Sequence, residues 1–210
     1  GKYHVLPRPG GEGKAIKLDH SPTGIPIYLA TLGPKALEYT GTAADGWLGT
    51  SFSPDHPEAH LSYIRMGADA AGRTLQDIEL HAACNVDIGE NVEELIDARR
   101  AGVAFQMGGM GSATTNFYND AFKRSGFSEA ACEIQRLWVE GRRDEARKIV
   151  PDEMITQFGA IGTPEMVRNR FNIYKAAGVD SLSLRFDNAL ETKAKIEMLE
   201  QVIDLLKGLD

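Results

Sequence analysis

The stretch from Ile25 to Tyr39 holds the residues best suited to bind an anion. Ile25 to Leu32 is short and mostly apolar, which is typical of a buried strand. Gly33 follows, and Pro34 fits the first position of a helix, where its missing N–H costs nothing. A strand, a tight turn and a helix N-terminus direct free N–H groups and the positive dipole end at one point, which favours phosphate.

Two interpretations of this turn remain open from the residues alone. A glycine and a proline also occur where a strand simply turns into a helix and nothing binds. No G-x-G-x-x-G motif is present, so a Rossmann dinucleotide site gets no support.

Few other residues are candidates for catalysis or ligand binding. His81 lies inside a predicted strand, where it is either an acid or base or, more commonly, a satisfied polar residue. No His or carboxylate pattern near it predicts a metal site, and no catalytic residue is identified. Lys35 and Arg185 either neutralise an anion or are ordinary surface charges. The glycine-rich segment 105–112 predicts an irregular backbone, close to a ligand or another chain, or simply a tight turn.

The composition limits the class of protein. The 210 residues are 42% hydrophobic and 25% charged, as in ordinary soluble globular proteins. The net charge of −7 argues against nucleic acid or a membrane surface as partner, and no apolar run is long enough to span a membrane. Cys84 and Cys132 predict buried free thiols, and with the polar first 17 residues they predict a cytoplasmic protein without a signal peptide.

The elements that would position these residues alternate between strand and helix. Strands are expected near 25–32, 46–52, 80–87 and 181–186, each followed by a helix. This predicts an α/β fold with parallel strands and four βα units in one region, 1–210, with a helical insertion at about 91–158. An eightfold barrel needs about 250 residues or more, so an open sheet or half of a barrel is expected.

Smaller signals refine this outline. Ser53 and Ser128 are predicted to cap the helices that follow them. The segment 159–165 is predicted to be a turn, with Thr163 as N-cap and Pro164 as first helical residue. The C-terminal helix, 190–206, carries an apolar stripe that we expect to pack in the core.

In a barrel, ligands meet the C-terminal ends of the strands. Here those ends carry the segments 30–33, 50–52, 85–86 and 185–186.

Several phrases together resemble the bacterial luciferase-like oxidoreductases, especially the branch that uses the deazaflavin F420. The phrases are IPIYLA with LGPK at 25–35, AADGWL at 43–48, GGMG with NFYN at 108–119, IGTPEMV at 161–167 and AAGVD at 176–180. No single phrase is specific, but their order and spacing extend over essentially the whole chain.

The resemblance implies a TIM-barrel-like (β/α)8 fold with F420, or alternatively FMN, at its C-terminal mouth. It also implies that this chain matches only the second half of the barrel, from the fifth strand onward. In the family, the turn after that strand contacts the cofactor phosphate. That role carries over to Ala30, Thr31, Leu32, Gly33, Pro34 and Lys35.

The implied function is hydride transfer between the cofactor and a small organic substrate. The family's ring-binding residues and most of its proposed proton donors lie in the other half, so a catalytically silent binding or structural module is the alternative. A different phosphate-binding barrel enzyme that uses His81 is a third. Open sheet edges predict pairing with a second copy, as a dimer, or with a missing N-terminal half.

Overall fold

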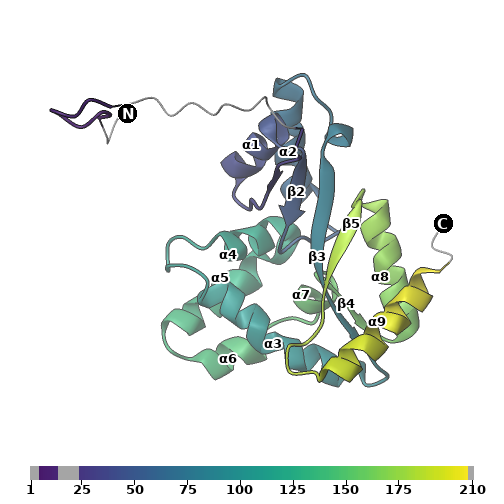
Figure 1. Ribbon diagram of the computed structural model, residues 1–210. Helices are drawn as coiled ribbons and strands as arrows, with labels where there is room; N and C mark the ends of the chain where they lie inside the picture. Colours follow the sequence, from purple (N-terminus) through teal and green to yellow (C-terminus); the bar gives the residue numbers. More distant parts are fainter. Residues whose placement is uncertain (1–4, 14–23, 208–210) are drawn as a thin grey trace.

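Strand β3 (Glu79–Ile88) lies at the centre of the fold. In the computed structural model, which describes residues 5–13 and 24–207, four further strands form one sheet with it (Figure 1). They are β1 (Tyr28–Leu29), β2 (Gly46–Gly49), β4 (Gly159–Gly162) and β5 (Ser181–Arg185). Every pair is parallel, which confirms the predicted class.

The register places three strands around β3. His81 pairs with Leu48 of β2 and with Ser181 of β5, whereas Asn85 pairs with Gly159 of β4 and Arg185 of β5. A strand residue has one neighbour on each side, so β5 occupies one edge of β3. Strands β2 and β4 therefore share the other edge, one after the other.

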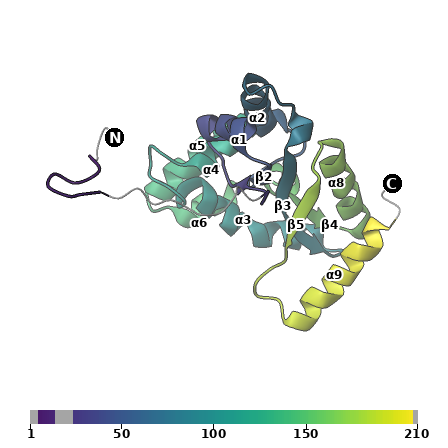
Figure 2. The ribbon, with the colours of Figure 1, turned by 45° about the horizontal axis from the view of Figure 1, so that its top comes forward.

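Helices cover one face of this sheet, and a helical insertion lies beyond the ends of the strands (Figures 1 and 2). The covering helices are α1 (Pro34–Ala43), α2 (Glu58–Ala70), α8 (Pro164–Ala176) and α9 (Thr192–Leu206). The insertion contains α3 (Val92–Gly108), α4 (Phe117–Phe122), the π-helical turn η2 (Lys123–Phe127), α5 (Ser128–Val139), α6 (Arg143–Lys148) and α7 (Glu153–Thr156). A short 3₁₀ helix, η1 (Leu75–Asp77), precedes β3.

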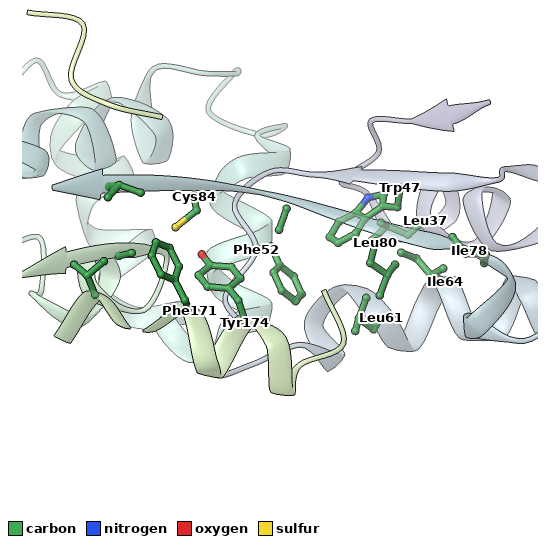
Figure 3. Packing of buried hydrophobic residues seen from close by; sticks show 14 of the residues in the cluster. Leu37, Trp47, Phe52, Leu61, Ile64, Ile78, Leu80, Cys84, Phe171 and Tyr174 are labelled. Carbon is green, nitrogen blue, oxygen red and sulfur yellow. The ribbon is translucent and has the colours of Figure 1, made fainter. Parts of the chain in front are cut away.

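The main core fills the space between β3 and the covering helices. Leu80, Ala82, Cys84 and Val86 alternate along β3 and are all buried. Figure 3 shows Cys84 of β3 close to Tyr174 of α8, and the same core includes side chains of α1 and α2. The insertion has a separate core, which includes Met107, Ile134 and Met154.

The other face of the sheet is more open. His81, Ala83 and Asn85 of β3 are half-buried, and Ser181, Ser183 and Arg185 of β5 are exposed. In a closed barrel, this face would be the interior. The described strands therefore form part of a barrel wall, with its inner surface accessible.

The structure changes three expectations about elements. Gly159–Gly162, predicted as a turn, is strand β4, and the strand expected over 25–32 is paired only at Tyr28–Leu29. The glycine-rich segment is partly helical, because α3 continues to Gly108. The predicted cap at Thr163 is present: its side chain accepts a hydrogen bond from the Met166 N–H, with Pro164 at the first turn.

Two expectations about burial are wrong. The apolar stripe of α9 is exposed rather than in the core, since Ile196, Leu199, Ile203 and Leu206 are 41–52% accessible and only Val202 of this helix is buried. Cys132 is also exposed, whereas Cys84 is buried as expected. Within the described residues, no helix could span a membrane.

Helices α1 and α2 pack at two glycines, and the fold depends on this close approach. A Cβ at Gly67 would lie 1.8 Å from the Glu38 carbonyl oxygen, and one at Gly41 would lie 1.9 Å from that of Ile64. We expect Gly67→Ala to lower the free energy of unfolding by about 3 kcal/mol, because the helices must separate. Urea denaturation measures this change.

The matched control is Gly102→Ala in α3, where a Cβ would meet nothing within 4 Å. Alanine is the better helix former, so this variant should gain roughly 0.5–1 kcal/mol. Equal stability of the Gly67 variant and the wild type would contradict the packing argument.

Candidate functional site

The turn before α1 presents backbone N–H donors, and no acidic side chain of α1's first turn pairs with them. Gly33 is the N-cap of α1, no side chain caps the helix, and its first turn contains no acidic residue. The Gly33 carbonyl accepts from the N–H groups of Ala36 and Leu37. Among the described residues, the N–H groups of Gly33 and Lys35 have no partner. This end of α1 is therefore suited to an anion.

Hydrogen bonds from two elements, β2 and η2, fix the shape of this turn. The Trp47 indole N–H donates to the Thr31 carbonyl at 2.9 Å. The Arg124 guanidinium donates to the Leu32 carbonyl at 2.8 Å and to the Ala59 carbonyl at 3.1 Å. Because Arg124 belongs to η2, these bonds tie the insertion to the turn.

The hydroxyl of Thr31 is already engaged. Thr40 Oγ1 donates to the Ala36 carbonyl at 2.9 Å, so its single hydrogen is used. The 2.7 Å contact between the two hydroxyls is then a bond donated by Thr31. Thr31 can contribute only a lone pair to a ligand, whereas the Thr50 hydroxyl has no partner among the described residues.

A groove of about 780 Å³ lies at this turn. The six predicted residues line it together with the adjacent Ala36 and residues from two other places in the chain. The full lining is Ala30, Thr31, Leu32, Gly33, Pro34, Lys35, Ala36, Thr50, Phe117 and Tyr118. Most of these side chains are apolar, so the groove suits a ligand with an apolar body and an anionic group near Lys35 and the α1 N-terminus.

Sequence reasoning did not assign Phe117 and Tyr118 to this groove. Asn116 positions them: its Nδ2 donates to the Gln106 and Met107 carbonyls, each at 2.9 Å, and its Oδ1 accepts from the N–H groups of Tyr118 and Asn119. A Cβ on Gly33 would lie 3.3 Å from the Phe117 ring. The ring thus rests on the glycine, and only an Asn N-cap in the sequence could have indicated this arrangement.

A second cavity, of about 230 Å³, lies at the C-terminal ends of the strands. It is lined by Thr50 and Ser51 after β2, Asn85 of β3, Arg185 of β5 and side chains of the insertion. Three predicted strand ends are therefore brought together. Thr50 lines both cavities, so the groove and this mouth cavity are neighbours at that residue.

An ion pair supports the mouth cavity. Arg99 Nε and Nη2 donate to the two Asp87 oxygens at 2.5 and 2.7 Å, and both side chains are largely buried. The carboxylate raises the pKa of Arg99, against the opposing effect of burial. This bidentate pair keeps the guanidinium charged and oriented beside the cavity.

The structure places His81 at the other end of the sheet. It is the third residue of β3, its Nε2 lies 3.2 Å from Glu79 Oε2, and its Nδ1 contacts the Ser181 hydroxyl. This cluster, with Tyr28 also bonded to Glu79, lies near the N-terminal ends of the strands. His81 lines neither the groove nor the mouth cavity, so neither contains a histidine acid or base. In the described part, no three His, Cys, Asp or Glu side chains are grouped so as to hold a metal ion.

A family model, Luciferase-like monooxygenase, matches residues 1–181. A protein of Mycobacterium tuberculosis, named as a coenzyme F420-dependent oxidoreductase, is 31% identical over 201 residues, which cover 92% of this chain and 58% of that protein. The 5,10-methylenetetrahydromethanopterin reductase of Archaeoglobus fulgidus is 28% identical and covers 93% of this chain and 62% of its own. The chain thus spans less than two thirds of these relatives.

Solved structures agree with the fold. The coenzyme F420-dependent tetrahydromethanopterin reductase of Methanopyrus kandleri superimposes with a TM-score of 0.62 at 27% identity, over 88% of this chain and 49% of that one. An F420-dependent secondary alcohol dehydrogenase, in complex with an F420–acetone adduct, gives 0.61 at 16% identity over the same shares. At that identity the second likeness concerns the fold alone.

His60 lies beneath the turn and makes stability depend on pH. The side chain is fully buried beside Trp47 and Phe52, and neither ring nitrogen has a partner among the described residues. Burial, with a smaller contribution from Arg124, lowers the pKa of His60 from 6.5 to about 3. Below pH 6.5 the unfolded chain therefore binds a proton that the folded chain excludes. The free energy of unfolding is unaffected by this residue above pH 6.5 and falls progressively as the pH decreases toward 3.

We expect the free energy of unfolding to fall by up to about 1.4 kcal/mol per pH unit from this residue as the pH decreases below 6.5. His60→Leu should remove that component of the slope, which urea titrations between pH 7 and pH 5 would measure. His56→Leu, at an exposed position, is the control and should keep the wild-type slope. Identical slopes for all three proteins would refute a buried neutral His60.

Proposed function

The chain belongs to the luciferase-like monooxygenase family, and we propose that it binds the phosphate end of coenzyme F420 in the α1 groove. In this proposal it is part of an oxidoreductase that transfers hydride between the deazaflavin and a small organic molecule. Because the chain spans only 58% and 62% of the first two relatives, the activity of a whole protein is part of the proposal.

One observation carries this function: the groove at the α1 turn and the mouth cavity share Thr50 in their linings. A ligand anchored by its phosphate at the N–H groups of Gly33 and Lys35 can extend past Thr50 into the mouth. F420 is preferred to FMN because relatives at 27–31% identity carry F420 or methylenetetrahydromethanopterin reductase in their names.

The residues present fit the phosphate end of such a group. Two free backbone N–H groups, the Lys35 ammonium and the Thr50 hydroxyl are donors, and no carboxylate lines the groove. Leu32, Pro34 and Phe117 supply apolar walls for the chain that follows the phosphate. When bound, the deazaflavin supplies the hydride chemistry, and the protein supplies binding and orientation.

The chain's own residues prepare the site before binding. Arg124 and Trp47 hold the Leu32 and Thr31 carbonyls, which keeps the N–H groups of the turn directed outward. Phe117 covers Gly33 and excludes water from one side of the groove. These fixed donors need little reorganisation when an anion arrives.

A second function is a catalytically silent module that keeps the fold and dimerises. The half-open inner face of the sheet favours it, since β1 and β5 each have one edge unpaired among the described strands. Pairing with a second copy, and a cytoplasmic location, stay predictions. Cofactor binding with turnover would contradict this alternative.

We expect the protein to bind F420, followed through the fluorescence of the deazaflavin. Lys35→Met and Thr50→Val should each weaken binding by about tenfold, because each removes one donor to the phosphate. Lys193→Met, on the exposed surface of α9, is a control of equal charge change and should keep the wild-type affinity.

Two results would contradict the proposal. One is the absence of F420 binding by a folded wild-type protein, as judged by circular dichroism. The other is equal loss in the Lys193 control, which would indicate a general charge effect. Adding inorganic phosphate should compete with F420 in the wild type and not in the double variant of Lys35 and Thr50.

A further inference from the structure

The inner face of the sheet places two polar side chains at the mouth. Asn85 of β3 and Arg185 of β5 are register partners, so their side chains emerge at the same level. Both line the mouth cavity. Within the described residues, Arg185 has no ion pair and the Asn85 amide has no hydrogen bond. A donor pair therefore remains available to a ligand.

Arg99 adds a second guanidinium to the same wall. Its Nε and Nη2 are used by Asp87, and its Nη1 is left without a partner among the described residues. The outer side of this wall forms an open groove of about 460 Å³, which also contains Lys195 and Asp187. The Asp187 carboxylate accepts a hydrogen bond from the Ala189 N–H, at 2.9 Å. Three cations face two carboxylates here, Asp187 and the Asp87 that pairs with Arg99, so this side of the mouth keeps one excess positive charge.

The opposite wall of the mouth cavity is apolar. It consists of side chains from the insertion and β4: Val103, Phe122, Met154, Ile155, Phe158 and Ile161. At about 230 Å³ the cavity is smaller than the sites of drug-sized ligands. A molecule that fits it is small, with an apolar body and one anionic end.

Ser51 supplies an independent sign that the mouth binds a ligand. Its hydroxyl is buried without a partner, and its φ of +50° lies in the left-handed region that is unusual for a serine. Strained backbone of this kind is found at ligand sites, where the surrounding structure maintains it. The residue lines the cavity, so its orphan hydroxyl is available to a polar atom of a bound ligand.

We propose that the mouth cavity is the substrate subsite and that it takes a small organic acid, with Arg185 and Asn85 binding the carboxylate. The insertion wall holds the apolar body. Only the role of the bound acid as a substrate rests on the proposed function. Binding of the acid itself does not require the cofactor. Arg185 is the residue that determines specificity for an anion.

The acidic tail of F420 could present the same carboxylate chemistry, so the test must separate the two sources. Hexanoate serves as the probe for the substrate subsite and 1-hexanol as its uncharged counterpart, both titrated by calorimetry. We expect hexanoate to bind and 1-hexanol to bind much more weakly. Arg185→Met should lose about tenfold in hexanoate affinity, and Arg185→Lys should recover part of it.

F420 titrations of the same variants complete the experiment. Unchanged F420 affinity in Arg185→Met, with lost hexanoate binding, supports the proposal; Lys193→Met should change neither. Reduced F420 affinity with unchanged hexanoate affinity would overturn it, because the arginine would then serve the cofactor tail. Equal binding of hexanoate and 1-hexanol would also overturn it.

The two proposals fail separately. F420 binding without any hexanoate binding refutes the subsite and leaves the cofactor proposal intact. Hexanoate binding without F420 binding retains an organic-acid site and refutes the cofactor proposal.

Discussion

The parallel register of β3 is the constraint on which both cavities depend. Because β2 and β5 pair with opposite edges of β3, the residues that follow β2 and the residue that ends β5 line the same cavity as Asn85. Shifting one pairing by a single residue would turn the inner-face side chains toward the helices. Arg185 would then enter the apolar core rather than the mouth. The buried alternation of Leu80, Ala82 and Cys84 opposes such a shift, so the core of the sheet also fixes the chemistry of its other face.

How far the sequence predicts this fold depends on whether a signal is local. The Gly33–Pro34 step and the Thr163 cap were predicted because their effect is within one helical turn. Ser53 and Ser128 were wrongly predicted as caps: α2 starts at Glu58, and Ser128 is already helical with Phe127 before it. Serine is only a preferred cap, and at Ser128 the chain continues directly from η2 into α5, with no side-chain cap. Strand β4 was missed because GAIG carries no alternation, being buried at every position.

The same distinction between local and long-range signals applies to the residues of the candidate site. The turn was predicted from adjacent positions and its six residues from the family resemblance, whereas Phe117 and Tyr118 reach the groove through the long insertion. That contact depends on Asn116 joining the end of α3 to the start of α4, and on Arg124 reaching the Leu32 carbonyl across 92 positions of sequence. Periodicity contains no information on such distances. The burial of the α9 stripe was mispredicted for a similar reason. Amphipathicity indicates that one face of a helix is apolar, but it does not indicate what covers that face.

Charge gives the last physical link between the two cavities. The whole chain carries −7, so its long-range field does not attract anions. An anionic ligand must therefore be held by local donors, and these occur at two separated places: the α1 turn with Lys35, and the Arg185 wall. Thr50 lies between them and lines both cavities. A cofactor phosphate and a substrate carboxylate bound at these two places would be kept apart, while their uncharged parts would approach each other beside Thr50, where hydride transfer requires close contact.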